Sequence, residues 1–123
     1  MEPIYIESTN RTPLVSMDPS GKFRIRGRSI HENPEKFFKP ILEWVEAYLE
    51  NPMDTTVFDI ELEYFNSGSS RYILDILRLL MDKKSDKKII INWYYEDGDD
   101  DLLERGQYYE SILNTRFNFI EFQ

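Results

Sequence analysis

The chain has 123 residues, and hydrophobic residues make up 41% of it, so it can form one folded domain with a single core and is not intrinsically disordered. Its formal net charge of −8 argues against a surface that binds nucleic acid or an anionic membrane, and we expect no nucleic-acid partner. It has no cysteine, which excludes a disulfide framework, a thiol nucleophile and a cysteine-based zinc site.

The chain begins with a short predicted strand in which Ile4 and Ile6 alternate with Tyr5 and Glu7. The surrounding residues, MEPIYIES, lack the basic segment and apolar run of a signal peptide. No apolar stretch of the sequence approaches the ~20 residues that a membrane helix needs. We therefore expect a cytoplasmic protein without direct membrane insertion.

A β-hairpin is predicted next, with strands at residues 14–17 and 22–26 and a type I turn at residues 18–21, DPSG. In its second strand Phe23 and Ile25 face one way, and three basic residues face the other: Lys22, Arg24 and Arg26. The same spacing recurs in an acidic row formed by Asp59, Glu61 and Glu63. The two rows either pair across neighbouring strands or are solvated independently.

Residues 27–33 are predicted to form a loop that contains His31, the single histidine of the chain. Without a second imidazole or a cysteine nearby, His31 is more typical of a surface loop than of a metal ligand. Asn33 and Pro34 predict the start of a helix, which Pro40 should kink or restart and which ends at residues 51–52. Its expected apolar face consists of Phe37, Ile41, Trp44, Val45 and Tyr48.

The stretch at residues 55–80 reads as a strand, a serine-rich turn and a helix. In the strand, residues 55–64, the side chains expected on the buried face are Phe58, Ile60, Leu62 and Tyr64. From residue 72 the period changes to that of a helix, with an apolar face at Ile73, Ile76, Leu77 and Leu80. The intervening turn consists of Asn66, Ser67, Gly68, Ser69 and Ser70.

This serine-rich turn has two interpretations on its residues alone. Ser69 or Ser70 can cap the helix, while Gly68 permits the turn. Alternatively the turn is an anion or phosphorylation site, because a helix N-terminus offers free N–H donors and the positive end of a dipole. The nucleotide-binding loop G-x-x-x-x-G-K-[ST] is absent.

The last third of the chain is predicted to contain a charged loop at residues 82–88, a central strand at 89–95, a helix and a terminal strand at 117–122. The run EDGDDD at residues 96–101 favours the first turn of that helix through the dipole, and Gly98 comes too early for an EF-hand loop. The helix has an expected packing stripe of Leu102, Gly106, Tyr109 and Leu113.

Together these elements indicate an α/β fold that forms a single domain at residues 1–123. A mixed β-sheet would carry the N-terminal hairpin, and the three helices would lie mainly on one face of it.

Four segments of the chain, in this order, resemble the SiaC family of bacterial regulatory phosphoproteins: TPLVSMDPSGKFRIRGRS, the helix ending in EWVEAYLENP, ELEYFNSGSSRYILDIL and WYYEDGDDDLLERGQYY. The family is similar in fold to the STAS domains of anti-sigma-factor antagonists, so the resemblance implies a STAS-like domain. It also implies a switch protein with no catalytic residue and no cofactor. Its partners would be a protein kinase, a PP2C-like phosphatase and a diguanylate cyclase, which the unphosphorylated form binds and activates in cyclic di-GMP signalling.

The resemblance also assigns the site. In the family the modified residue is typically a threonine directly after the asparagine of a Tyr-Phe-Asn-Thr-Ser-Ser-Ser motif. Ser67 stands at that position here, and Gly68, which we expect to loosen the loop, replaces the next serine. The phosphosite loop that binds partners would comprise Phe65, Asn66, Gly68, Ser69, Ser70 and Arg71.

Two other functions stay open at this point. One is a small metal-dependent hydrolase that uses the acidic run at residues 96–101 together with His31. The other is a structural partner protein whose capped helix is never modified. We expect no metal site, because the sequence shows no ligand cluster.

Overall fold

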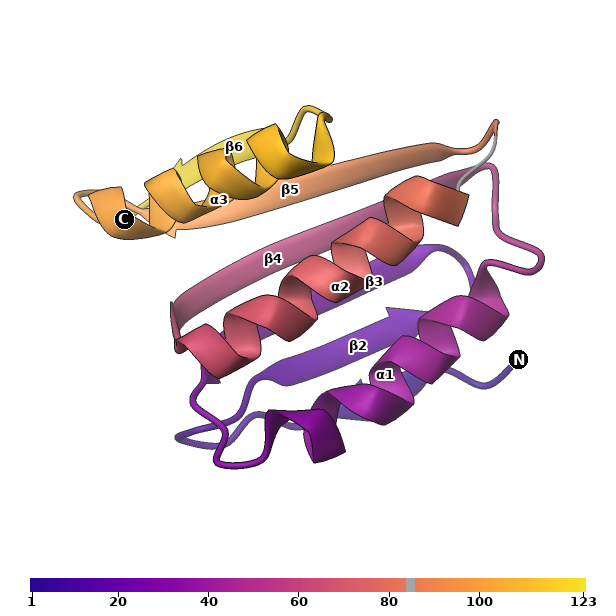
Figure 1. Cartoon of the computed structure of the whole chain (residues 1–123), viewed down its shortest axis with the longest axis horizontal. Helices are drawn as coiled ribbons and strands as arrows, with labels where there is room; N and C mark the ends of the chain where they lie inside the picture. Colours follow the sequence, from indigo (N-terminus) through magenta and orange to yellow (C-terminus); the bar gives the residue numbers. More distant parts are fainter. Residues whose placement is uncertain (84–85) are drawn as a thin grey trace.

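The computed structural model describes residues 1–83 and 86–123, which form a mixed sheet with helices packed against it (Figure 1). The strands are β1 (Ile4–Ile6), β2 (Leu14–Asp18), β3 (Lys22–Ser29), β4 (Thr55–Phe65), β5 (Lys88–Glu96) and β6 (Asn118–Phe122). The helices are α1 (Pro34–Tyr48), α2 (Ser67–Lys83) and α3 (Asp100–Leu113). The predicted α/β class, with its N-terminal hairpin, is confirmed.

The strands lie in the sheet in the same order as in the chain, from β1 to β6. β1, β2 and β3 pair antiparallel, and β3 to β6 pair parallel through the three helices. Each parallel crossover steps to the next strand in the same direction, and such crossovers share one handedness. All three helices must therefore cover the same face of the sheet, as Figure 1 shows and as predicted.

The core lies between this face and the helices. The predicted buried side chains of α2 are all fully buried, and so are Phe58 and Ile60 of β4. In α1 the prediction is wrong at one position: Phe38 is fully buried, whereas Phe37 is partly buried and packs on His31. The helix runs through Pro40 without a restart.

β4 contains a bulge near its end. Tyr64, predicted to be buried, is 54% exposed, and the next residue, Phe65, is 1% exposed. The pairing of β4 with β3 skips Glu63 at a register shift between Gly27 and Arg28. One extra residue reverses the alternation of side chains. Phe65 therefore enters the core directly before the serine-rich stretch.

The face of the sheet that carries no helix bears the charged rows. β3 and β4 are neighbours, with Arg24 opposite Asp59 and Arg26 opposite Glu61, so the rows pair across the strands; Lys22 lies opposite Val57 instead. Two ion pairs between Nε and Oε2 form on this face: Arg26 with Glu61 at 2.9 Å, and Arg28, which lies beyond the predicted basic row, with Glu63 at 3.3 Å. Pairs this exposed contribute about 0.2–1 kcal/mol each.

Two predicted loops differ from the structure at their ends. β3 continues to Ser29, so the loop before α1 is shorter than residues 27–33. In the predicted charged loop at residues 82–88, positions 82 and 83 belong to α2 and position 88 begins β5. Positions 84 and 85 lie outside the described residues.

Candidate functional site

The serine-rich stretch is the first turn of α2 rather than a turn that precedes it. The helix begins at Ser67, and Asn66 caps it. The Oδ1 of Asn66 accepts a hydrogen bond from the backbone N–H of Ser69 at 3.0 Å, and its carbonyl accepts one from the N–H of Ser70 at 2.9 Å. The prediction of Ser69 or Ser70 as the cap is therefore wrong, because the asparagine already satisfies that role.

The three hydroxyl groups of this turn have different environments. Ser67, the first residue of the helix, is exposed, whereas Ser69 is fully buried. Ser70 is partly buried, and its Oγ is hydrogen-bonded to the hydroxyl of Tyr109, which also donates to the Ser70 carbonyl at 3.1 Å. Ser67 alone among the three presents its hydroxyl to an enzyme that approaches from solvent.

The start of α2 suits an anion. Within the described part of the chain, the amide N–H groups of Ser67 and Gly68 have no hydrogen-bond acceptor. Unpaired amides and the positive end of the dipole of this 17-residue helix both favour negative charge there. A phosphate on Ser67 would therefore be compatible with the fold.

Gly68 is the second residue of the helix and not part of a loop, so the expectation of a loosened loop does not describe its position. A Cβ atom on Gly68 would meet the Cγ of Pro34 at 3.4 Å, which is ordinary van der Waals contact. A serine or alanine therefore fits at this position.

Arg71 lies one turn after Ser67 and is exposed. Its guanidinium carbon lies 5.8 Å from the centroid of the Tyr72 ring. Among the described residues it forms no ion pair, so an i,i+4 pair with Asp75 is not present.

Helix α3 supplies two contacts to the site that sequence reasoning missed. Nη1 of Arg105 donates to the carbonyl of Phe65 at 2.8 Å, and its guanidinium carbon lies 4.5 Å from the centroid of the Phe65 ring. One turn later, Tyr109 holds Ser70, and burial raises the pKa of the Tyr109 hydroxyl, which keeps it protonated. The only signal in the sequence was the predicted packing stripe of this helix. Tyr109 belongs to that stripe, and Arg105 directly precedes its member Gly106.

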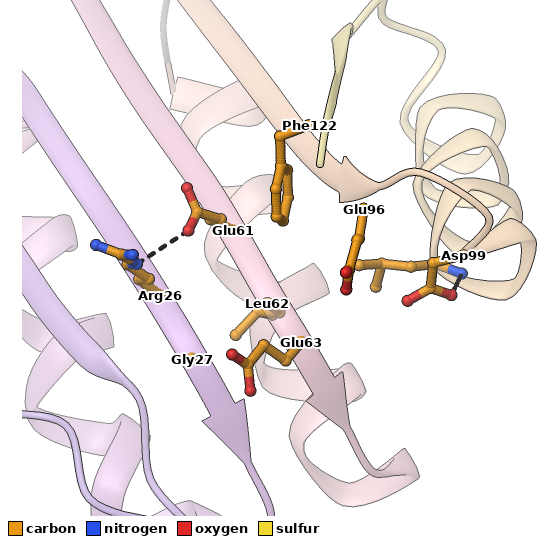
Figure 2. A pocket seen from close by; sticks show the side chains of 9 residues that line it. Arg26, Gly27, Glu61, Leu62, Glu63, Glu96, Asp99 and Phe122 are labelled. Carbon is orange, nitrogen blue, oxygen red and sulfur yellow. Dashed lines mark hydrogen bonds and ion pairs between the residues drawn. The ribbon is translucent and has the colours of Figure 1, made fainter.

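A cleft of about 240 Å³ opens where β4 and β5 diverge (Figure 2). Their pairing ends at Ile60 and Trp93, although both strands continue. Figure 2 shows Glu61 and Glu63 on the β4 side and Glu96 and Asp99 on the other. The cleft is lined by Arg26, Gly27, Glu61, Leu62, Glu63, Glu96, Asp99, Leu102 and Phe122.

The end of the acidic run at residues 96–101 forms the start of α3, as predicted, whereas Glu96 is the last residue of β5. Oδ1 of Asp99 accepts a hydrogen bond from the backbone N–H of Leu102 at 3.1 Å, so Asp99 is the cap, and Asp100 and Asp101 lie in the first turn. The described ranges contain no group of three or more histidine, aspartate or glutamate residues placed to hold a metal ion.

His31 lies on the loop before α1, whereas the acidic run precedes α3, and α2 lies between these two helices (Figure 1). Its ring packs 4.3 Å from Phe37 and 5.3 Å from Phe38 between centroids, and its desolvation lowers its pKa. The structure thus does not bring together the residues of the proposed metal-dependent hydrolase. None of the helices in the described ranges is long and apolar enough to cross a membrane.

Comparison with known proteins agrees with this geometry. The family model described as SiaC family regulatory phosphoprotein matches residues 6–122. An uncharacterised protein of Pseudomonas aeruginosa (strain UCBPP-PA14) is 26% identical over 119 residues, which cover 95% of this chain and 94% of the relative. The crystal structure of apo-SiaC from Pseudomonas aeruginosa has a TM-score of 0.86 and 25% identity, with all of both chains covered.

A second solved structure contains SiaC of Pseudomonas aeruginosa as the activator in complex with the diguanylate cyclase SiaD. It matches this fold with a TM-score of 0.89 at 24% identity, covering 97% of this chain and 99% of that one. From the family match over nearly its whole length, the present chain belongs to the SiaC family of regulatory phosphoproteins.

Proposed function

We propose that this protein is a phosphorylation-controlled switch that binds and activates a diguanylate cyclase while Ser67 is unmodified. Family membership supports the regulatory role, and the complex of Pseudomonas aeruginosa SiaC with SiaD supports a cyclase as the target. The assignment of the site rests on the exposure of Ser67 at the first position of α2. Of the two other serines in this turn, Ser69 is buried and Ser70 is hydrogen-bonded to Tyr109. The protein acts by binding and has no catalytic residue of its own.

Two enzymes would set the state of the switch. A protein kinase transfers the γ-phosphoryl group of ATP to Oγ of Ser67, which loses its proton, and ADP leaves. A PP2C-like phosphatase hydrolyses the phosphate ester with water, which restores the hydroxyl and releases inorganic phosphate. Because ATP and the GTP used by the cyclase are cytoplasmic nucleotides, we place the switch in the cytoplasm.

The partner surface would comprise the exposed parts of residues 65–71 together with Tyr64, which the bulge in β4 turns outward. A phosphate adds about −1.5 to −2 charges, and the helix N-terminus stabilises such an anion by ~0.3–2 kcal/mol, so the modified protein stays folded. At the interface the same group must be desolvated against a surface shaped for a hydroxyl. Weakening the complex about a hundredfold takes only ~2.7 kcal/mol.

The proposal is tested with variants of Ser67 and purified partners. We expect Ser67→Ala to bind the cyclase whether or not kinase and ATP are present, and Ser67→Glu to bind more weakly, with both variants folded. The carboxylate carries less charge than a phosphate, so the mimic weakens binding only in part. Ser111→Ala, which changes an exposed serine on α3, is the matched control and should behave as wild type.

Two results would count against the proposal. Labelling of Ser67→Ala by the kinase as complete as that of wild type would place the acceptor elsewhere. Intact-mass measurement of the protein from its native cells would support the unmodified structural partner if no fraction carried the added mass of a phosphoryl group under any growth condition.

A further inference from the structure

Helix α3 contacts the chain on both sides of Ser67. Arg105 is bonded to the carbonyl of Phe65, two residues before the serine, and Tyr109 is bonded to Ser70, three residues after it. Arg105 and Tyr109 are one helical turn apart on α3, so a single rigid element holds the whole segment. Any change in these contacts is transmitted to α3.

Most hydrogen-bond donors of the Arg105 guanidinium have no acceptor among the described residues. It carries five N–H donors, and the described residues accept a hydrogen bond from one of them, through the neutral carbonyl of Phe65. It lines a cavity of about 140 Å³ together with the carboxylates of Glu63, Asp99 and Asp101, yet it forms an ion pair with no described residue. The residue is exposed, so an anion from solvent or from a neighbouring side chain can reach it.

We propose that Arg105 is the intramolecular ligand of the phosphate on Ser67, so that α3 senses the modification of α2. The inference rests on the phosphorylation of Ser67 proposed above. A single residue, Asn66, separates Phe65 from Ser67, so the Cα atoms of those two residues lie no more than about 7.6 Å apart. An arginine side chain that rotates about its bonds, together with the length of a phosphoryl group, is long enough to span a separation of this size.

The competition between the two acceptors favours the phosphate. Hydrogen bonds between ionised partners are about twice as strong as those between neutral groups, and a phosphate accepts two parallel bonds from one guanidinium. The carbonyl of Phe65 offers neither advantage. In this proposal the rotation of Arg105 toward the phosphate takes it away from Phe65 and removes one of the two contacts by which α3 holds the site.

The consequence extends to the cleft in Figure 2. Asp99 and Leu102, at the start of α3, line this cleft. A shift of α3 on release of Arg105 would therefore reach this cleft as well as the phosphosite.

The rival ligand is Arg71, whose position four residues after Ser67 places it on the same side of α2. Its guanidinium is also exposed and without an ion pair in the described residues. Unlike Arg105, however, Arg71 belongs to α2 itself. A phosphate bound to Arg71 alone would leave the contacts of α3 unchanged, so the two assignments differ in what they predict for α3.

The test uses full-length protein in which phosphoserine is installed at position 67 during translation, so that it depends on neither the kinase nor the cyclase. The ³¹P resonance is titrated to give the second pKa of the phosphate in wild type and in Arg105→Gln, Arg71→Gln and Arg78→Gln. A guanidinium in contact with the phosphate lowers this pKa, so Arg105→Gln should raise the midpoint by about 0.5–1 pH unit. Arg78→Gln removes the same charge from an exposed position farther along α2 and gives the baseline for long-range effects.

Hydrogen exchange of α3 is the second measurement. In wild type, phosphoserine at position 67 should speed the exchange of amides around Arg105, and in Arg105→Gln it should have no further effect. A midpoint in Arg105→Gln equal to that in Arg78→Gln would overturn the proposal. If Arg105→Gln fails to fold, Arg105→Lys keeps the charge without the planar donor fork, and it should raise the midpoint by less than the full amount.

The role of Arg105 can be refuted without refuting the proposed function, because the two are tested by different measurements. Unmodified Arg105→Gln should still be labelled by the kinase at Ser67, because the acceptor hydroxyl is unchanged. Failure of labelling in wild type would refute the proposed switch, whereas an unshifted midpoint would refute only the role of Arg105.

Discussion

Ser67 and Ser69 belong to the same turn of one helix, yet the first is exposed and the second is fully buried. Successive residues of an α-helix are rotated by about 100°, so residues two apart face nearly opposite sides. Asn66 sets this rotation because it caps the helix at a defined residue. A helix that began at another residue would turn different hydroxyls toward solvent, so the cap decides which serine an enzyme can reach.

The cap itself could not be read from the local sequence. Asn66, Ser67, Ser69 and Ser70 all have side chains that cap helices well. Tertiary structure makes the choice, because the bulge in β4 buries Phe65 and thereby fixes where the chain turns.

Replacement of Gly68 by alanine should stabilise the protein. Alanine has a higher helix propensity than glycine by up to about 1 kcal/mol in a helix interior, and Gly68 lies in the first turn, where the gain is smaller. The new methyl group would lie 3.4 Å from the Cγ of Pro34, which costs little. We expect the free energy of unfolding, measured with urea, to rise by about 0.5 kcal/mol. A decrease would show that Gly68 is needed for its backbone freedom after all.

At the scale of the elements, α3 packs on β5 through a glycine. A Cβ atom on Gly106 would lie 2.7 Å from Nε1 of Trp93 and 2.8 Å from Cε1 of Phe119. The indole of Trp93 is fully buried and donates to the carbonyl of Leu102 at 3.1 Å, so it has no free direction in which to move. This close approach positions α3 and, with it, the side chains that reach the start of α2.

Replacement of Gly106 by alanine should therefore lower the free energy of unfolding, whereas the replacement of Gly68 should raise it. The propensity gain of about 1 kcal/mol is smaller than the ~1–3 kcal/mol that overpacking costs, so we expect a net loss of stability. Thermal and urea unfolding would measure it, and Gln107→Ala, at the exposed neighbouring position, is the control. Stability equal to or above that of wild type would contradict the close packing of α3 on Trp93.

Periodicity predicted the elements best where one face buries a regular row of apolar side chains. The faces of α2 and of the first part of β4 are as expected, because each buries a regular row of apolar side chains. The prediction fails at Tyr64, where the pairing of β4 with β3, and not the sequence of β4, inserts the extra residue. The contact between Arg105 and Phe65 joins residues 40 positions apart, so no local pattern could indicate it.

At the scale of the whole molecule, His31 makes stability depend on pH near neutrality. Desolvation against the aromatic residues of α1 lowers its pKa below the ordinary value of about 6.5. As the pH falls through about 6.5, the unfolded chain binds the proton before the folded protein does. The free energy of unfolding should therefore decrease over that range and level off once the pH falls below the pKa in the folded protein.

Urea unfolding of wild type and of His31→Gln, at pH values from about 7.5 to 5.5, isolates this contribution. The carboxylates titrate alike in both proteins, so the difference between them reports His31. We expect the stability of wild type relative to His31→Gln to decrease as the pH is lowered. A difference that is independent of pH would mean that the imidazole is solvated as in the unfolded chain.

The order of the strands, which is the same in the sheet as in the chain, also has a consequence for biosynthesis. Each strand that leaves the ribosome finds its neighbour already present at the growing edge, so the sheet can extend in the direction of translation. Arg105 and Tyr109, which hold the start of α2 from outside, belong to α3, and α3 leaves the ribosome after α2. In a nascent chain Ser67 therefore leaves the ribosome before Arg105 and Tyr109, and the proposed phosphosite is held from outside only after α3 has emerged.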